Sequence, residues 1–505
     1  MTPASFSARR HRMAAVRRST FLVLVAACAA PAQVTDGPNA AAVFAKIWTV
    51  PLSQYAQSNQ YANSVTQLSN GVIVAAGADG YQPNACAPNV GGAWLIALTP
   101  AGGNVWQKLY STCASDSQVA SVVRATRDGG LVLAGSDLSN AGCGLGCVLI
   151  AKLTPAGAIT WQHDLTNVFG ATLRDIRQTA DGGYIAAGNV IPADSTTFNT
   201  NALLVKLSPA GAIQWARDFD ETAASFPGAV SGGAANFSFG SVAQTSDGGY
   251  ILSGTAEAHF ATGYANALVV LKVDARGNSQ WQTVYYSGEW GSAAAGDSLY
   301  RIFPANGGYV IAGAVETLVY PFARLFLLMQ LDAAGNPLWQ YGYGGVNGLF
   351  NVNLAASASA TSDAGYLLAG LSDAFLSGPY TVYTGWMLKT DGAGNIQWQN
   401  AYTGTTSGGQ QFNDVIQTAD GGYAAAGYSY VGSGSYGGPG FFVVKTDANG
   451  RVGGCSCVVS TSSAPQTLDL VAYPAAFIQA RDTALSPGPV SLQTKLTSVK
   501  PVTLR

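Results

Sequence analysis

The sequence carries little charge. Only 10% of its 505 residues are Asp, Glu, Lys or Arg, whereas an average soluble domain has about 25%. The formal net charge is −2, and no basic run occurs after residue 18. Proteins that bind nucleic acids neutralise phosphates with clustered Lys and Arg, so this composition argues against a nucleic-acid partner.

Histidine is also scarce, with only His11, His163 and His259 in the chain. This number excludes a metal site built from several histidines in the mature protein, and a Ser-His-Asp triad would need His163 or His259. The recurring Asp-Gly-Gly turns offer one carboxylate each, whereas a calcium loop needs several oxygen ligands in close series. We therefore expect neither a metal ion nor a cofactor.

Apolar runs long enough to span a bilayer are missing as well. A short apolar run at residues 21–27 follows five arginines and predicts an export signal over residues 1–27. The segment Leu24-Val25-Ala26-Ala27-Cys28 resembles the lipobox of bacterial lipoproteins. Cys28 would then be the lipid attachment site and residues 28–43 a linker. Ordinary cleavage after Ala30-Pro31-Ala32 is the alternative.

Cysteine is limited to seven residues, and removal of Cys28 leaves six. An even number suits disulfides in an oxidising compartment. Cys86 lies in a loop of the first repeat described below, and Cys113 follows the last strand of that repeat. We expect the pairs Cys86–Cys113 and Cys143–Cys147. The pairing of Cys455 and Cys457 stays open.

Glycine, in contrast, is abundant, and much of it belongs to a repeated octet. The cleanest copy is Asp181-Gly182-Gly183-Tyr184-Ile185-Ala186-Ala187-Gly188. Seven related octets end at Gly77, Gly135, Gly188, Gly254, Gly313, Gly370 and Gly427. Their final glycines lie 53 to 66 residues apart. A period of this length predicts a repeat architecture in which all copies share one body.

Each repeat predicts four strands, which we call a to d. In the third copy, strand a covers residues 173–179, strand b residues 184–188 and strand c residues 202–207, and strand d contains Trp215. Tight turns join a to b and c to d, so the unit is a four-stranded antiparallel sheet. Seven such units predict an all-β, seven-bladed β-propeller. A β-solenoid would need a much shorter period.

Strand b consists of small residues and strand d carries a bulky tryptophan. We therefore expect strands a and b near the axis of the propeller and strands c and d at its rim.

The last repeat lacks the tryptophan strand, and an unassigned strand precedes the first repeat around Trp48. We interpret this as ring closure, with the N-terminal strand completing blade 7 beside residues 442–445. The alternative is that residues 451–460 supply strand d of blade 7 and the N-terminal strand adds outside it. The propeller then covers residues 44–460, and residues 461–505 form a short β-rich tail.

The string Asp-Gly-Gly-Tyr-x-x-x-Gly, followed by apolar-Lys-Leu, a turn and Trp-Gln, resembles a known repeat across residues 44–450. It is similar to the propeller-type repeats of secreted and surface proteins of bacteria and archaea, including the delta-60 repeat group. The resemblance implies an exported surface propeller and supplies no catalytic motif. The c–d hairpin also resembles repeats of quinoprotein dehydrogenases and of an outer-membrane assembly lipoprotein. A quinone is not expected, because the chain has no adjacent cysteines and seven repeats where that enzyme fold has eight.

The loops between strands b and c vary in length and sequence, and variable loops on a rigid scaffold commonly carry function. We expect ligand contact on the side where these loops lie. The expected ligand-binding residues are acids just past strand b and aromatic or histidine residues in the loops: Asp79, Asp137, Glu257, Glu316, Asp373, His259, Tyr264, Trp290, Tyr380 and Tyr430. The acids have a structural alternative, since they could simply cap strand ends.

Three functions remain open at this stage. The first is a non-catalytic, monomeric cell-surface propeller, either an outer-membrane lipoprotein or secreted, that binds an extracellular glycan or an envelope or surface protein. It would contact a membrane only through its lipid anchor. The second is a scaffold lipoprotein in envelope assembly, and the third is a carbohydrate-active enzyme with paired carboxylates.

Overall fold

A computed structural model gives the fold. It describes residues 42–48, 60–79, 92–111, 118–137, 147–166, 169–192, 199–220, 236–260, 263–287, 300–305, 307–317, 323–344, 352–375, 383–402, 409–430, 439–453, 458–461, 466–467, 470–474, 479–482, 486–488, 493–496 and 502–503. These residues form strands and turns, and among them no helix is long and apolar enough to cross a membrane.

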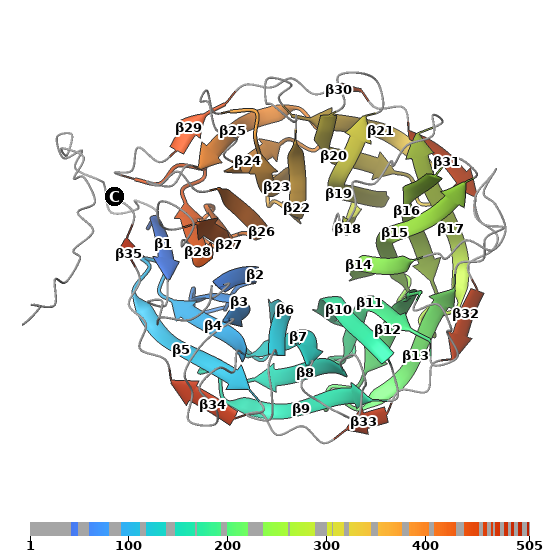
Figure 1. The fold of residues 1–505 in the computed structure, drawn as a ribbon, viewed down its shortest axis with the longest axis horizontal. Coiled ribbons are helices and arrows are strands. Elements are labelled where there is room, and N and C mark those ends of the chain that lie inside the picture. Colours follow the sequence, from blue (N-terminus) through green and yellow to red (C-terminus); the bar gives the residue numbers. More distant parts are fainter. Residues whose placement is uncertain are drawn as a thin grey trace, which may run out of the picture.

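The described strands form seven antiparallel sheets arranged as blades around a central axis (Figure 1). The innermost strands a are β2 (Gln60–Gln67), β6 (Gln118–Ala125), β10 (Phe169–Gln178), β14 (Phe237–Gln244), β18 (Arg301–Ala305), β22 (Asn353–Ala360) and β26 (Gln410–Gln417). Strands b are β3 (Ile73–Asp79), β7 (Leu131–Asp137), β11 (Tyr184–Ile191), β15 (Tyr250–Phe260), β19 (Gly308–Thr317), β23 (Tyr366–Ser372) and β27 (Tyr423–Tyr430).

Strands c and d complete the blades toward the rim. Strands c are β4 (Gly92–Leu98), β8 (Cys147–Leu153), β12 (Asn201–Leu207), β16 (Gly263–Val273), β20 (Ala323–Leu331), β24 (Thr384–Thr390) and β28 (Pro439–Thr446). Strands d are β5 (Asn104–Ser111), β9 (Ile159–Thr166), β13 (Ile213–Asp220), β17 (Ser279–Ser287), β21 (Pro337–Tyr343), β25 (Ile396–Tyr402) and, for blade 7, β1 (Phe44–Trp48). The seven-bladed propeller with strands a and b inside is therefore confirmed.

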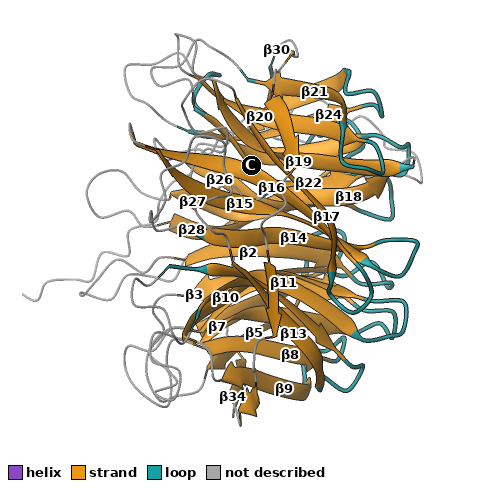
Figure 2. Cartoon of the chain, turned by 90° about the vertical axis from the view of Figure 1, so that its right-hand side faces the viewer, coloured by secondary structure: helices purple, strands orange, loops and turns teal. Residues whose placement is uncertain are grey.

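Antiparallel pairing gives the molecule two distinct sides. The a–b and c–d turns lie together on one side of the ring, which we call the turn side (Figure 2). The ends of strands b and the beginnings of strands c lie at the opposite side, which we call the loop side. Glycines at positive φ, such as Gly182 and Gly211 in blade 3, make the tight turns of the turn side possible.

The N-terminal strand closes the ring as the sequence predicts. β1 pairs directly with strand c of blade 7, with Phe44 opposite Lys445 and Trp48 opposite Phe441. This register corrects one detail, because the position opposite the strand-c lysine holds tryptophan in other blades, as in the pair Lys206 and Trp215. Phe44, and not Trp48, takes the tryptophan position in blade 7.

The alternative assignment of residues 451–460 to strand d of blade 7 is wrong. Within that segment, β29 (Val458–Ser460) pairs instead with β25 of blade 6.

The C-terminal tail adds a fifth strand to every blade. After β29, the strands β30 (Gln466–Thr467), β31 (Leu470–Pro474), β32 (Gln479–Asp482), β33 (Ser486–Gly488), β34 (Gln493–Leu496) and β35 (Val502–Thr503) pair in turn with blades 5, 4, 3, 2, 1 and 7. We call these seven strands the belt. It follows the rim of the propeller (Figure 1) and pairs with the outer edge of each strand d, the kind of edge that otherwise invites aggregation.

Neighbouring blades are held by aromatic side chains of strand d. The Trp398 indole donates a hydrogen bond to the carbonyl of Ala448 in the c–d turn of the next blade, at 3.1 Å. The Tyr402 hydroxyl donates to the carbonyl of Gly450 in the same turn, at 2.6 Å. A Cβ atom on Gly450 would lie 2.5 Å from the Trp398 ring. Glycine is therefore needed at this turn for two reasons: it adopts the positive φ, and it lets the tryptophan ring approach closely.

Phe44 makes the corresponding contact across the ring closure, where a Cβ on Gly102 of blade 1 would lie 2.7 Å from its ring. We predict that Phe44→Ala destabilises the protein by about 3–5 kcal/mol, because it empties a buried aromatic position at the closure. Leu338→Ala is the control, since Leu338 is 60% exposed and its loss should change stability by less than about 0.5 kcal/mol. Chemical denaturation of both variants measures the difference. Equal midpoints for Phe44→Ala and wild type would contradict the role given to Phe44.

Candidate functional site

On the loop side, two of the predicted acids fasten the start of strand a to the end of strand b. The backbone N–H of Val352 donates to Asp373 Oδ1 at 2.8 Å, and the Asp373 N–H donates to the Val352 carbonyl at 3.1 Å. Asn236 donates to Glu257 Oε2 at 3.1 Å in the corresponding place of blade 4. Asp373 is buried, so its carboxylate serves this junction within the protein.

The other predicted acids take the same strand-end position. Asp79 pairs with Gln60, Asp137 pairs with Gln118, and Glu316 pairs with Arg324. In blade 4 the β15–β16 hairpin extends beyond Glu257 and brings His259 directly opposite Tyr264.

Several expected residues lie outside the described part of the chain. These are Cys28, Cys86, Cys113, Cys143, Trp290 and Tyr380. Cys147 is described as the first residue of β8, where its backbone pairs with Asp137. The lipid attachment and both disulfides therefore stay predictions.

Two tyrosines are the exposed aromatic residues of the described loop side. Tyr430 is 41% exposed and Tyr383 is 37% exposed. Both flank one backbone segment, because the Tyr430 N–H donates to the Gly409 carbonyl and the Tyr383 carbonyl accepts from the Gln410 N–H. Tyr430 also packs edge-on against Tyr428, with ring centroids 5.6 Å apart. We call Tyr383 and Tyr430 the tyrosine pair.

Five charged side chains from the inner strands meet at the axis of the propeller. They are Arg124, Asp175, Arg177, Arg301 and Asp414, and we call them the channel cluster. Arg124 Nη1 lies 2.8 Å from Asp414 Oδ2, and Arg124 Nη2 lies 3.6 Å from Asp175 Oδ1. Arg301 bridges the same two carboxylates at 3.7 and 3.6 Å. Residues of blades 2, 3, 5 and 7 thus interact across the axis.

Serines from the remaining inner strands complete the cluster. Ser64 and Ser357 donate to the two oxygens of Asp414 at 2.8 and 2.6 Å. Ser241 donates to Asp175 at 3.2 Å. Blades 1, 6 and 4 supply these hydroxyls, so all seven blades contribute to one buried polar network.

Burial opposes ionisation of Asp414, yet its pKa lies well below the usual value. The positive charges of Arg124 and Arg301 and the hydrogen bonds from Ser357 and Arg124 outweigh the loss of solvation. The pKa of Asp175 is lowered for the same kind of reason, with Arg177 as its nearest cation. Both carboxylates are therefore ionised and paired at neutral pH.

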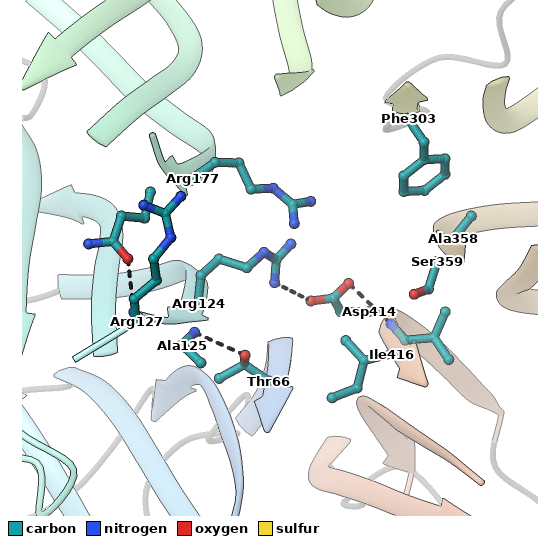
Figure 3. A pocket seen from close by; sticks show the side chains of 12 residues that line it. Thr66, Arg124, Ala125, Arg127, Arg177, Phe303, Ala358, Ser359, Asp414 and Ile416 are labelled. Atoms are coloured by element: carbon teal, nitrogen blue, oxygen red, sulfur yellow. Dashed lines mark hydrogen bonds and ion pairs between the residues drawn. The ribbon is translucent and has the colours of Figure 1, made fainter. Parts of the chain in front are cut away.

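A pocket of about 370 Å³ adjoins the channel cluster (Figure 3). It is formed by the ends of strands a that lead into the a–b turns, so it belongs to the turn side. Its lining consists of Thr66, Arg124, Ala125, Arg127, Arg177, Gln178, Phe303, Ala358, Ser359, Asp414, Val415 and Ile416. No site was expected here from the sequence, because the variable loops that suggested recognition lie on the loop side.

A sequence signal for the channel cluster exists. Asp175 and Asp414 each lie opposite the strand-b residue three positions after the octet tyrosine, which is Ala187 in blade 3 and Ala426 in blade 7. Serine holds the same position of strand a in blades 1, 4 and 6, at Ser64, Ser241 and Ser357. Aligning strands a of the seven repeats would have placed these polar residues in one layer.

The turn aspartates bind both their own turn and a lysine on strand c. Asp247 accepts from the Gly249 N–H within its own turn, and also from Lys272 Nζ at 2.8 Å. The lysine lies on strand c and is buried. Equivalent ion pairs are Lys152–Asp128, Lys206–Asp181, Lys389–Asp363 and Lys445–Asp420. Hydrogen bonds from Lys272 and Thr245 lower the pKa of Asp247 to about 2.

The two exceptions vary together. Blade 1 has Asn70 at the turn position and Ala97 in place of the lysine, and blade 5 has Asn306 and Gln330 in these positions of the sequence. A buried ammonium without a carboxylate is unfavourable, which explains why the two residue types change in concert.

Metal ligands do not gather in the described part of the chain, where no group of three or more His, Cys, Asp or Glu side chains could hold an ion.

Comparisons with known proteins assign no family to this chain. No protein-family model matches the sequence, and no curated protein matches it significantly. Among solved structures, an α-L-arabinanase of Penicillium chrysogenum complexed with arabinobiose matches with 12% identity and a TM-score of 0.43, covering 80% of this chain and 98% of that chain. A GH43_12 protein retrieved from a capybara gut metagenome matches with 9% identity and a TM-score of 0.27, covering 92% of this chain and 95% of that chain.

The lysine–aspartate pairs predict a compensating mutation. Asp181→Asn should destabilise the protein by roughly 1–3 kcal/mol, because it leaves the buried Lys206 without its carboxylate. Adding Lys206→Ala recreates the Asn–Ala combination of blade 1 and should cost less than the sum of the two single changes. Urea unfolding of the wild type, both single variants and the double variant measures this coupling. Strictly additive effects would show that the pair has no energetic link.

Acid should destabilise the fold through these same aspartates. Their pKa values are lower in the folded protein than the value of about 3.9 for an unfolded chain. Their contribution is therefore complete above about pH 5 and is lost as the pH falls from about 5 toward 2. Melting temperatures across this range test the prediction. The double variant Asp247→Asn with Lys272→Gln copies the residue pair of blade 5. Its melting temperature should fall less steeply with decreasing pH than that of the wild type.

Proposed function

We propose that the protein is a non-catalytic, exported propeller that binds a glycan or protein ligand on its loop side. The tyrosine pair supports this proposal most directly, because Tyr383 and Tyr430 are each more than a third exposed and their backbones bond to the same segment of the loop side. Tyrosine rings offer flat apolar area with a polar edge at a low cost in conformational entropy, which suits both sugars and protein surfaces.

The channel cluster favours binding over hydrolysis. A glycoside hydrolase with two carboxylates needs one of them protonated as the general acid near neutral pH. Asp175 and Asp414 are both held ionised by arginines, and their pKa values are shifted away from the range that such an acid needs. A carbohydrate-active enzyme remains the alternative function. Its catalytic carboxylates would then have to be among the loop-side acids.

Export is part of the proposal through the predicted signal and the lipid attachment at Cys28. A protein with this cysteine at its mature N-terminus would be held at a membrane surface by the lipid alone. Replacing Cys28 with Ser should release the protein into the soluble fraction, and the intact mass of the wild type should show an acylated Cys28. An unmodified chain starting at Gln33 would show ordinary cleavage and a secreted protein.

A glycan array, together with a pull-down from envelope extracts, tests the binding function. We expect a ligand whose affinity falls about tenfold or more when Tyr383 and Tyr430 are both replaced by Ala, because each ring supplies exposed contact area. Leu338→Ala is the matched control, since it removes an exposed apolar side chain next to a c–d turn, away from the loop side. If binding survives the double tyrosine change but is lost in Leu338→Ala, recognition takes place on the turn side.

Incubation with a panel of polysaccharides separates binder from enzyme. The proposal predicts no new reducing ends over a time in which binding is measurable. Release of reducing ends that is lost in Glu257→Gln or Glu316→Gln would establish the enzyme alternative. Recovery of envelope-assembly proteins, with no glycan bound, would favour the scaffold.

A further inference from the structure

The channel cluster holds one more positive than negative charge. Arg124, Arg177 and Arg301 stand against Asp175 and Asp414. A guanidinium group does not lose its proton in proteins, so the excess cannot be removed by deprotonation. Excess charge at a poorly solvated place is unfavourable unless a counter-charge or water approaches it. The excess falls at Arg177, which has 36% of its side chain exposed and faces the pocket.

Hydrogen-bond donors of the cluster remain unused. Arg177 contacts Asp175 through its Nε at 3.2 Å, and its two terminal nitrogens have no acceptor among the described residues. They point into the open space of the pocket (Figure 3). Arg124 is buried, and its Nε likewise lacks an acceptor in the described part of the chain. Arg127 lies at the start of the a–b turn of blade 2, where it is exposed. It adds a third guanidinium group to the lining of the pocket.

The pocket walls differ in character. Guanidinium groups of blades 2 and 3 form one wall, and Phe303 of blade 5 lies across the space from them (Figure 3). Ala358 and Ile416 extend the apolar part, and Ser359 offers a hydroxyl. A volume of about 370 Å³ is within the lower range of small-molecule sites.

Charge and geometry select the kind of ligand. A guanidinium group presents parallel N–H donors that match the two oxygens of a carboxylate. Asp414 also lines the pocket, and its negative charge would oppose a doubly charged phosphate more strongly than a singly charged carboxylate. Phe303 offers a flat apolar face for the rest of a ring-shaped molecule.

We propose that this pocket on the turn side is a binding site for a small, ring-shaped carboxylate, such as a sugar acid, whose carboxylate is bound by Arg177 with help from Arg124 and Arg127. The site is separate from the tyrosine pair and lies at the opposite side of the ring. It gives the protein a second recognition surface close to the axis, where residues of several blades converge.

Ligand-observed NMR titration of the wild-type protein tests the site with D-glucuronate as the probe. D-glucose serves as the neutral counterpart of nearly equal shape, acetate as a carboxylate without a ring, and inorganic phosphate as another anion. We expect glucuronate to bind at least tenfold more tightly than glucose, acetate or phosphate. Equal binding of glucose would overturn the role of the carboxylate, and tighter binding of phosphate would overturn the assignment of a carboxylate site.

Variants locate the binding. Arg177→Gln should weaken glucuronate binding at least tenfold, and Arg177→Lys should weaken it less, since it keeps the charge but loses the paired donors. Arg127→Gln should weaken binding several-fold and is independent of folding, because Arg127 is exposed and outside the buried cluster. Melting curves verify that each variant is folded. Unchanged binding in both Arg177→Gln and Arg127→Gln, or an equal loss in Tyr430→Ala on the loop side, would overturn the proposal.

Discussion

Seven inner strands have to meet near one axis without leaving a hole or a clash, and the channel cluster is how this chain meets that constraint. Arg124 and Arg301 come from blades 2 and 5, yet both bridge Asp175 of blade 3 and Asp414 of blade 7. Serines of the other blades bind the same carboxylates. Blades that do not touch each other along the rim are thereby coupled at the centre, and a shift of one blade would disturb ion pairs of several others.

The two sides of the ring follow from this central coupling. On the turn side, stereotyped turns and lysine–aspartate pairs repeat from blade to blade, and the repetition leaves individual residues little freedom. The pocket arises where that repetition is broken. One position of strand a holds Thr66, Ser359 and Ile416 in blades 1, 6 and 7, but arginine, as Arg124 and Arg177, in blades 2 and 3. Recognition on the turn side thus depends on differences among inner strands, whereas on the loop side it depends on the ends of strands b.

Much of the fold could be predicted because its determinants are local and recur seven times. The octet marks the a–b turn and strand b, the second turn marks the c–d hairpin, and the missing tryptophan strand indicated ring closure. The register of that closure could not be predicted, since a phenylalanine fills the tryptophan position and nothing in a single copy says so. The β-rich nature of the C-terminal tail was predicted, but its path around the rim was not, because its strands pair through backbone groups and do not share the repeat pattern.

The candidate sites were predictable to a smaller extent. Acids at the ends of strands b were found from their position, but the hydrogen bond from Val352 to Asp373 joins segments that are distant along the repeat and has no local signal. Arg124, Asp175 and Asp414 come from three different repeats and meet only at the axis. Within a single repeat such residues are only departures from the common pattern. They are nevertheless the positions where the seven copies act as one structure.

The belt has a consequence for the order of assembly. It runs around the rim against the direction of the blades and ends with β35 on β1, so that Thr503 pairs with Lys46, a residue almost the whole chain length away. Contacts of such large sequence separation form late, because the loop they close is long. Blade 7 then combines β1, the seventh repeat and β35, and it cannot be finished until Val502 and Thr503 have been synthesised. A growing chain can fold its middle blades early and close the ring once β28 has been made, but blade 7 lacks its outermost strand until Val502 and Thr503 arrive.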